Sequence, residues 1–250
     1  MAYSNKTSFS RKTVNRPFQR LQTELGQIIS ETKAGEKLLS EPALARNLGV
    51  SRSTLREVMR SFEAQGLIRR QQGLGTFVVD KPQIFEAGLE KLESIETIAR
   101  RINLSVSMGE VIISKIQVDK KLKEVFNVPS NDQIWQIRRI ISAEKRPIAY
   151  LVDSVLENLL SEKDFQNSFS GSVLDLLLKR GQPVLTKSFT EIQAIAAPAD
   201  IARALQIQRN DALLFFIADL YSADGKVVDH SESYFLPGYF RFHVVRSVTE

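Results

Sequence analysis

The chain of 250 residues contains no cysteine. This absence excludes disulfide bonds, thiolate nucleophiles and cysteine-based zinc or iron–sulfur sites, and it is typical of proteins from a reducing compartment. No apolar run approaches the roughly 18 to 20 residues that a membrane helix needs, and the N-terminal residues lack the apolar core of a signal peptide. We therefore expect a cytoplasmic protein that makes no membrane contact.

Histidine is also scarce, since only His230 and His243 are present. Without cysteine or a spaced cluster of His, Asp and Glu, the sequence predicts no metal site, no cofactor and no catalytic residues. The run "DHSES" places His230 between Asp229 and Ser231, with Glu232 next. Alternation along a strand would send Asp229 and Ser231 to one face and His230 and Glu232 to the other, so we expect no catalysis from this run.

Positive charge is confined to the first third of the chain. Residues 1–79 hold 13 Lys and Arg against 6 Asp and Glu, a net charge of +7, whereas residues 80–250 hold 21 against 23, a net charge of −2. A basic region on a near-neutral remainder is expected of a protein that binds a polyanion at one end. A solvated basic face would have the same charge, so the motifs must decide between the two.

The basic region reads as an N-terminal arm followed by a small helical domain. Residues 1–15 are polar without an apolar period, which predicts a flexible basic arm. Over residues 16–79, apolar residues at three- and four-residue steps predict three helices, with Ser40 and Ser51 as N-caps of the second and third. Two short strands, "GLIRRQ" and "TFVV", follow and are joined by "QGLG".

This arrangement favours a winged helix-turn-helix domain. Ala45, Gly49 and Leu55 have the spacing of a small residue at a helix contact, a turn glycine and an apolar anchor. The start of the third helix would then enter the major groove, and the hairpin would lie along the sugar-phosphate backbone. We expect a double-stranded DNA partner and the following DNA-contacting residues: Arg46, Ser51, Arg52, Ser53, Thr54, Arg56, Gln72, Gly73, Gly75 and Thr76.

The rest of the chain predicts a second domain of a different class. Residues 80–96, interrupted by Lys81-Pro82, are a candidate linker with a short helix at its end. In residues 97–250, strand patterns outnumber short helices and are joined by the turns "AEKRP" and "ADGK". The sequence therefore predicts an α+β fold in which this second domain is built around a mostly antiparallel sheet.

The first domain resembles a known family. The stretch "GEKLLSEPALARNLGVSRSTLREVMRSFEAQGLIRRQQGLGTFV" is similar to the winged-helix domain of GntR-type bacterial transcription regulators, over residues 16–79. It departs from that family at Pro42, where an arginine or another polar residue is usual near the DNA backbone. One DNA contact would be lost there, and Arg46 or the N-terminal arm would compensate.

Residues 90–250 resemble the ligand-sensing UTRA domain of the HutC branch of that family, whose fold is like that of chorismate lyase. The resemblance rests on "IRRIISAEKRPIAY", "GSVLDLLLKRG", the "TEIQAI" stretch and "DHSESYFLPGYFRF". It implies a pocket for a small anionic or polar effector. Arg139 matches an arginine that often meets an anionic ligand, and the remaining expected ligand-binding residues are Arg138, Ser172, Glu191, Glu232 and Tyr234.

Two departures from sugar-phosphate sensors, Ile141 for a second arginine and Leu151 for a glutamate, remove polar contacts and favour a smaller or more apolar effector. We interpret the protein as a dimeric repressor that binds a palindromic operator and is released by a metabolite, because one winged domain reads too few base pairs for specificity. The alternative is a chorismate-lyase-like enzyme fused to a DNA-binding domain. A constitutive architectural DNA binder would not need so large a second domain.

Overall fold

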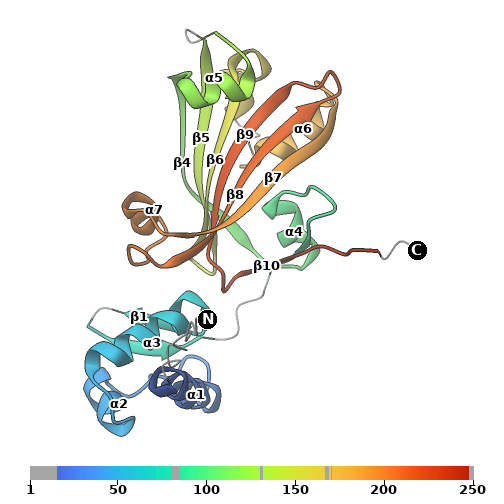
Figure 1. Ribbon diagram of the computed structural model, residues 1–250. Helices are drawn as coiled ribbons and strands as arrows, with labels where there is room; N and C mark the ends of the chain where they lie inside the picture. Colours follow the sequence, from blue (N-terminus) through green and yellow to red (C-terminus); the bar gives the residue numbers. More distant parts are fainter. Residues whose placement is uncertain are drawn as a thin grey trace, which may run out of the picture. The chain divides into compact units, whose positions relative to one another are not determined.

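The chain forms two compact units, Met1–Lys81 and Pro82–Glu250. The computed structural model drawn in Figure 1 describes residues 16–71, 73–79, 85–129, 132–166, 169 and 171–247. The predicted N-terminal arm, residues 1–15, lies outside the described residues. Among the residues that are described, no helix is long and apolar enough to cross a membrane.

The first unit contains the predicted three helices and antiparallel hairpin. Its elements are α1 (Arg16–Glu31), α2 (Glu41–Asn47), α3 (Arg52–Ala64), β1 (Ile68–Gln71) and β2 (Gly75–Val78). The segment before α2 extends the hairpin, because Lys37 bridges to Phe77 and the amide of Leu38 donates to the carbonyl of Thr76 over 2.8 Å. This extra pairing was not predicted, since a single bridge leaves no strand pattern in the sequence.

The helix boundaries follow local chemistry. Ser51 caps α3, because its hydroxyl accepts a hydrogen bond from the amide of Thr54 over 3.1 Å. Ser40 occupies the N-cap of α2 without a side-chain cap bond. The apolar stripes of all three helices meet in one core with the hairpin, where the fully buried side chains include Leu21, Leu25, Leu44, Leu55, Met59 and Ile68. This core fixes α3 against α2 as a helix-turn-helix requires.

The second unit is built on the predicted antiparallel sheet. Its six strands lie in the order β4-β5-β6-β9-β8-β7, and every neighbouring pair is antiparallel. The strands are β4 (Val106–Gln117), β5 (Gln133–Ala143), β6 (Arg146–Leu156), β7 (Leu185–Ala196), β8 (Ala212–Ser222) and β9 (Val227–Phe235). The turn between β5 and β6 has positive φ at both Glu144 and Lys145, which suits a tight hairpin.

Helices cover parts of both faces of this sheet (Figure 1). α4 (Ile95–Arg101) and α6 (Val173–Arg180) lie on one face, where Glu96 and the Gly171 carbonyl both bind Arg139. α5 (Lys120–Phe126) and α7 (Ala199–Ala204) lie on the other, where Lys121 pairs with Glu232. Two short 3-10 turns, η1 (Glu157–Leu159) and η2 (Glu162–Phe165), follow β6.

The predicted linker is shorter than residues 80–96. β3 (Phe85–Gly88) pairs in parallel with β10 (Phe240–His243), and α4 begins at Ile95. Phe85 is fully buried and stacks on Phe240 with ring centroids 4.8 Å apart. Residues from 85 onward therefore belong to the second unit. The sequence pattern missed this pair because four-residue strands more than 150 positions apart leave no local signal.

Candidate nucleic-acid interface and ligand pocket

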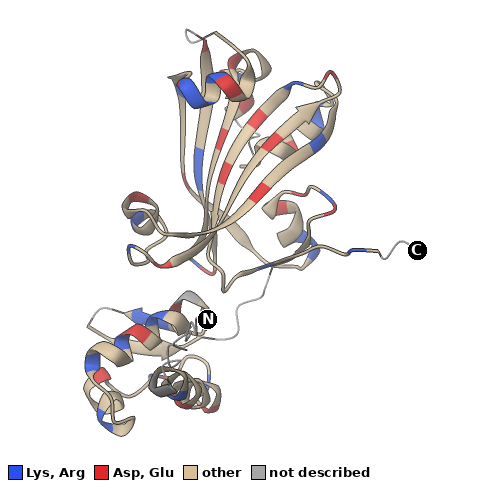
Figure 2. Ribbon diagram, in the orientation of Figure 1, with Lys and Arg blue, Asp and Glu red and all other residues tan. Residues whose placement is uncertain are grey.

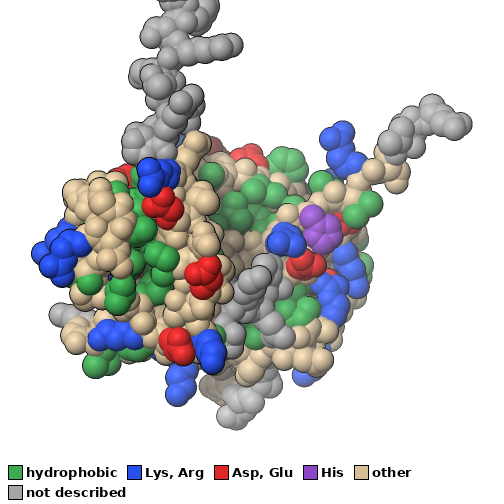
Figure 3. Space-filling model, turned by 90° about the horizontal axis from the view of Figure 1, so that it is seen from below, with side chains coloured by type: hydrophobic (Ala, Val, Ile, Leu, Met, Phe, Trp, Pro, Cys, Tyr) green, Lys and Arg blue, Asp and Glu red, His purple; other side chains and the backbone are tan. Residues whose placement is uncertain are grey.

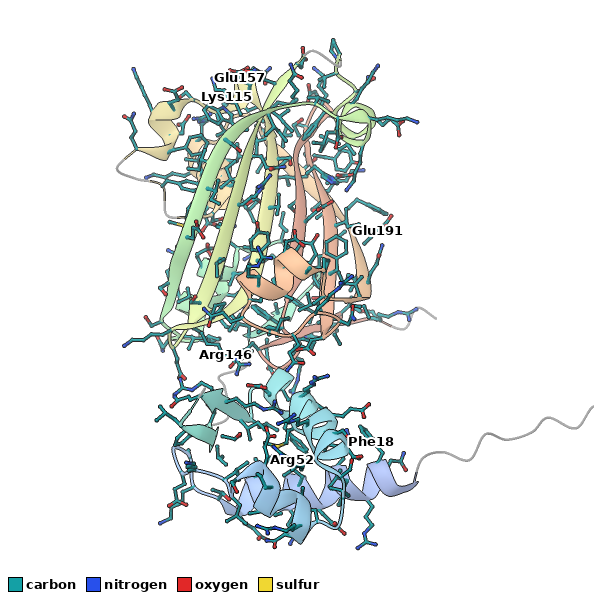
Figure 4. All side chains as sticks on the ribbon, turned by 90° about the vertical axis from the view of Figure 1, so that its left-hand side faces the viewer. Phe18, Arg52, Lys115, Arg146, Glu157 and Glu191 are labelled. Carbon is teal, nitrogen blue, oxygen red and sulfur yellow. The ribbon has the colours of Figure 1, made fainter. Side chains whose placement is uncertain are left out.

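The start of α3 presents the side chains that were expected to read DNA. Ser51, Arg52 and Ser53 are exposed, and Thr54 is partly buried. The Ser51 hydroxyl also lies 2.8 Å from the hydroxyls of both Ser53 and Thr54. These hydroxyls therefore hold the first turn of α3 in shape, while Arg52, labelled in Figure 4, has no ion pair among the described residues.

Arg56, one turn further along α3, is already engaged. Its Nε donates to Oε2 of Glu41 over 2.6 Å, and Arg70 of the wing approaches the other oxygen of Glu41 at 3.9 Å. This cluster ties α2, α3 and β1 together and offsets part of the positive charge of Arg56. Arg46, in the last turn of α2, is exposed. The guanidinium groups of Arg52 and Arg46 are therefore more available for DNA contacts than that of Arg56.

The wing tip has glycines at positions that favour glycine, but Thr76 does not face outward. Gly73 and Gly75 have φ values of +76° and +119°, which side chains with a Cβ adopt only at a cost. Leu74 between them is 60% exposed. Thr76 is only 6% exposed, so the expected phosphate contact through its side chain is wrong: its place in β2 turns it toward the core of the first unit. Gln72 lies outside the described residues.

Pro42 lies in the first turn of α2 and is exposed. The position at which the family resemblance implies a polar residue therefore faces solvent here with an uncharged ring. Lys and Arg side chains on the face drawn in Figure 3 are scattered among hydrophobic and neutral groups. Because charge alone does not outline a continuous patch there, the interface is identified by α3 and the wing.

A cavity of about 580 Å³ opens within the second unit, on the face of the sheet that carries α4 and α6. Its walls come from β3 and the following loop, from α4, from the start of α6 and from strands β5 to β9. Five buried polar residues line it: Ser94, Arg139, Asp153, Ser172 and Asp229. This is the size of a small-molecule site, and its wall combines apolar side chains with convergent polar groups.

Arg139, the expected anion-binding residue, does line the cavity. It is 5% exposed, and its Nη1 donates to Oε1 of Glu96 over 2.8 Å and to the carbonyl of Gly171. Asp153 Oδ2 lies 3.6 Å from its Nε. The guanidinium is therefore neutralised by the protein itself, which weakens the expectation of an anionic effector.

Ser172 also lines the cavity, as expected, and is 1% exposed. Its hydroxyl caps α6 by accepting a hydrogen bond from the amide of Asp175 over 3.0 Å. Leu151, one of the two departures from the sugar-phosphate pattern, is part of the cavity wall, whereas Ile141 is buried in the core. At Leu151, the cavity wall therefore has an apolar side chain where the sugar-phosphate pattern has a glutamate.

The other expected ligand-binding residues are not in this cavity. Along β9, the cavity is lined by Asp229, Ser231 and Ser233, so alternation sends Glu232 and Tyr234 to the opposite face. Glu232 pairs with Lys121 of α5 at 2.5 Å, and Tyr234 stacks on Phe215 with ring centroids 4.6 Å apart. The sequence pattern divided this strand into its two faces correctly. The expected ligand residues, Glu232 and Tyr234, lie on one face, and the cavity is lined by the opposite face.

Arg138 and Glu191 are excluded by the same alternation. Arg138 neighbours Arg139 on β5 but is exposed and donates through Nε to Gln136 over 2.7 Å. Glu191 lies between two cavity-lining residues of β7, Thr190 and Ile192, and is exposed (Figure 4). A neighbouring pair on a strand cannot both enter one pocket, which is why only Arg139 does.

Sequence reasoning missed Asp153 and Asp229 as members of the site. Each is less than 8% exposed, and burial raises the pKa of both carboxyl groups. Arg139 opposes the rise for both, whereas Asp153 adds to the rise at Asp229. The available signal was the occurrence of two aspartates inside otherwise apolar strands, "YLVDSVL" and "KVVDHSE".

His230 lies on the face away from the cavity. Its Nδ1 is 2.6 Å from Oδ1 of Asp219 on the neighbouring strand. The predicted split of the "DHSES" run is confirmed, because Asp229 and Ser231 line the cavity and the side chains on either side of Ser231 do not. The only histidine of the run is therefore not placed beside the cavity carboxylates.

Two families match the chain. Residues 107–241 match the UTRA domain, and residues 25–78 match the bacterial regulatory proteins of the gntR family. The first match spans most of the sheet that carries the cavity. The second spans α3 and the wing.

Two named relatives match most of this chain. The chain is 23% identical over 215 residues to the mannosyl-D-glycerate transport/metabolism system repressor MngR of Escherichia coli K12. The match covers 86% of this chain and 88% of that protein. It is 24% identical over 212 residues to the HTH-type transcriptional repressor NagR of Bacillus subtilis 168, covering 83% and 86% respectively.

Among solved structures, the fold matches that of PhnF from Mycobacterium smegmatis with a TM-score of 0.62 and 18% sequence identity, covering 92% of this chain and all of that one. The relatives are named as repressors and give no support to the enzyme alternative. The chain belongs to the gntR family of bacterial regulatory proteins, in the form that carries a UTRA domain, and is a DNA-binding transcription regulator that responds to a small ligand.

Proposed function

We propose that the protein is a homodimeric repressor whose two winged domains bind the half-sites of a palindromic operator, and that a small effector in the cavity of the second unit releases it. One observation carries the regulatory part. The segment that follows the winged unit in the chain, β3 and its loop up to Ile95, forms one wall of the effector cavity.

This wall offers a route between the two sites. Ala87 and Gly88 of β3 and the loop residues 89–94 line the cavity, and β3 is held by β10. A ligand that fills the cavity contacts these residues directly and favours one arrangement of them over another. Because the same residues lead back to the winged unit, such a preference changes the free energy of DNA binding.

Repression is the favoured sign of regulation because the similar proteins MngR and NagR are both named repressors. Dimerisation follows from specificity. One recognition helix reads only a few base pairs, and two related half-sites multiply the discrimination against a genome of competing sequences. At the DNA, Arg52 is the side chain best placed to donate to a guanine edge, while Arg46 and the wing glycines approach phosphates.

A binding comparison tests the DNA-reading part. The probe is a duplex selected from a randomised library by the wild-type protein. Substitution Arg52→Ala is expected to weaken binding by about 1 to 3 kcal/mol in a gel shift, because a base contact is lost. The thermal unfolding temperature is expected to stay unchanged, since Arg52 is exposed and has no ion pair among the described residues.

Substitution Arg20→Ala is the matched control. Arg20 carries the same charge in the same unit but lies on α1 and pairs with Glu24 at 2.6 Å. It is expected to weaken DNA binding much less than Arg52→Ala does. Equal affinities for wild type and Arg52→Ala would refute the placement of α3 as the recognition helix.

A further inference from the structure

The polar floor of the effector cavity contains more acidic than basic side chains. Asp153 and Asp229 face the cavity beside Arg139, and Glu96 of α4 binds that arginine from the side. Three carboxyl groups thus surround one guanidinium. Figure 2 shows Asp and Glu positions on several neighbouring strands of the sheet and a basic band on β5, on both faces together.

Several of these carboxyl oxygens make no hydrogen bond to the described residues, and neither does Nε of Arg139, which lies 3.6 Å from Oδ2 of Asp153. Within the described part of the chain, Oδ1 of Asp229, Oδ2 of Asp153 and Oε2 of Glu96 are buried and accept no hydrogen bond. Asp153 and Asp229 are 7% and 6% exposed. A buried polar group without a partner costs free energy, and a carboxylate costs more than a neutral group. The cavity therefore has unfilled acceptors at its floor.

The missing partner is a donor that carries positive charge. An anion at this floor would meet two carboxyl groups, and Arg139 is already bound by Glu96. A neutral hydroxyl would donate hydrogen bonds but leave the charge imbalance in place. A bare metal ion would sit against the guanidinium of Arg139 and leave the rest of a 580 Å³ cavity empty. An organic ammonium satisfies both the acceptors and the charge.

Above the floor, the cavity is lined by an apolar group of side chains and, at other places, by polar ones that include Glu90, Lys91, Glu93 and Lys187. The apolar group includes the side chains of Ile95, Phe216, Leu220, Phe235 and Phe242. Resting on the function proposed above, we propose that the effector is an organic amine whose ammonium group binds between Asp153 and Asp229. Its carbon body packs on these apolar side chains.

The titration of the floor supports this assignment. Burial raises the pKa of Asp229 most, and the charges of Asp153 on β6 and of Asp219 on the opposite face of β8 add to the rise. Arg139 on β5 and a hydrogen bond from the backbone of Ser154 lower it. A bound ammonium lowers that pKa again and displaces the proton. Amine binding is therefore expected to strengthen as the pH rises from 5 to 8.

The absence of cysteine allows a direct test of the cavity potential. Substitution Ser231→Cys places one thiol opposite Asp153 in the strand register and two residues from Asp229. The thiolate attacks methanethiosulfonate reagents that carry an ammonium, a hydroxyl or a sulfonate group on an ethyl arm. A mixed disulfide forms and methanesulfinate leaves. The ratio of ammonium to sulfonate rates reports the local potential, because the reactivity of the thiol itself cancels.

The reference is Ser107→Cys, at an exposed position of β4. The rate ratio at position 231 is expected to exceed the reference ratio by about tenfold or more. Adding Asp229→Asn is expected to lower the ratio, whereas Glu232→Gln, on the same strand but the opposite face, is expected to leave it unchanged. A ratio at or below the reference overturns the proposal, and so does a thiol that is closed to all three reagents.

The adducts of Ser231→Cys then separate this proposal from the function on which it rests. The ammonium adduct is expected to raise the unfolding temperature by about 2 °C or more over the hydroxyl adduct, and the sulfonate adduct to lower it. An ammonium adduct no more stable than the hydroxyl adduct refutes the amine site even if DNA binding is normal. A stabilising ammonium adduct that binds the selected duplex with the same affinity as the hydroxyl adduct supports the amine site and refutes the coupling to DNA.

Discussion

At the scale of single residues, the same side chain type has opposite roles in the two units. Arg52 is exposed at the start of α3, whereas Arg139 is buried and held by Glu96 and a backbone carbonyl. An exposed guanidinium can exchange water for a DNA base or phosphate at little cost. A buried one that is already paired can accept a new anion only by giving up a partner. Arginine in a sensor pocket is therefore no guide to ligand charge until its partners are known.

The buried aspartates give the stability of the protein an unusual pH dependence. The folded protein raises the pKa of Asp229 well above its ordinary value, so the folded state binds this proton more tightly than the unfolded chain does. Its stabilising contribution is complete below the unfolded pKa and is lost as the pH rises through the folded pKa. In the variant Asp229→Asn, the side chain cannot ionise, so the stability that the wild type loses as the pH rises is kept. The unfolding temperature of the variant relative to wild type is therefore expected to increase from pH 5 to pH 8.

Asp224→Asn is the control, because the pKa of Asp224 is shifted in the opposite direction to that of Asp229. Hydrogen bonds from Ser222 and Lys226 lower the pKa of Asp224, so its contribution is present above the ordinary carboxyl range and is lost on acidification. Thermal unfolding of both variants at pH 5 and pH 8 measures the difference. A relative unfolding temperature of Asp229→Asn that falls or stays level over this range would show that the carboxyl group is not held in its protonated form.

At the scale of elements, the sequence predicted the long periodic segments and missed the short paired ones. The three helices of the first unit, its hairpin and the six-strand sheet follow from local apolar periods and turn residues. β3 and β10 could not be predicted, because their pairing depends on contacts between distant segments. For the pocket, alternation divided β9 into two faces. Which face of the sheet lines the cavity depends on where α4 and α6 pack, and no local sequence pattern carries that information.

The wing depends on a glycine whose backbone conformation is unfavourable for other residues. Gly75 has a φ of +119°, and a Cβ there would lie 2.4 Å from Cε of Lys37. The lysine end can move away, but the backbone strain remains. Gly75→Ala is expected to lower the stability of the winged unit by about 1 to 3 kcal/mol. If the wing contacts the DNA backbone as proposed, the substitution is also expected to weaken binding to all DNA sequences alike.

Gly26→Ala is the matched change in the same unit. Gly26 lies inside α1, and a Cβ there would meet Phe62 at 3.4 Å, an ordinary contact. This substitution is expected to stabilise by about 0.5 to 1 kcal/mol, because alanine favours the helix. Denaturant unfolding of both variants gives the comparison. If Gly75→Ala proves as stable as wild type, the wing does not hold the backbone conformation described above.

At the scale of the whole molecule, a dimer with two winged domains makes a geometric prediction about its operator. Both recognition helices must meet the major groove on the same side of the duplex, so half-site centres lie whole helical turns apart. Inserting about 5 base pairs between the half-sites of the selected duplex turns one half-site to the far side. Binding by both domains is then expected to fail, and affinity to fall toward that of a single half-site.

An insertion of about 10 base pairs returns the second half-site to the original side of the duplex and is expected to recover part of the loss. Recovery is incomplete, because the reach between the two domains is limited by how the second units associate. Gel shifts with the three duplexes at one salt concentration measure the effect, since salt changes every phosphate contact. A monomeric reader would bind all three with equal affinity, and that result would remove the symmetric dimer from the mechanism while leaving Arg52 as a DNA contact.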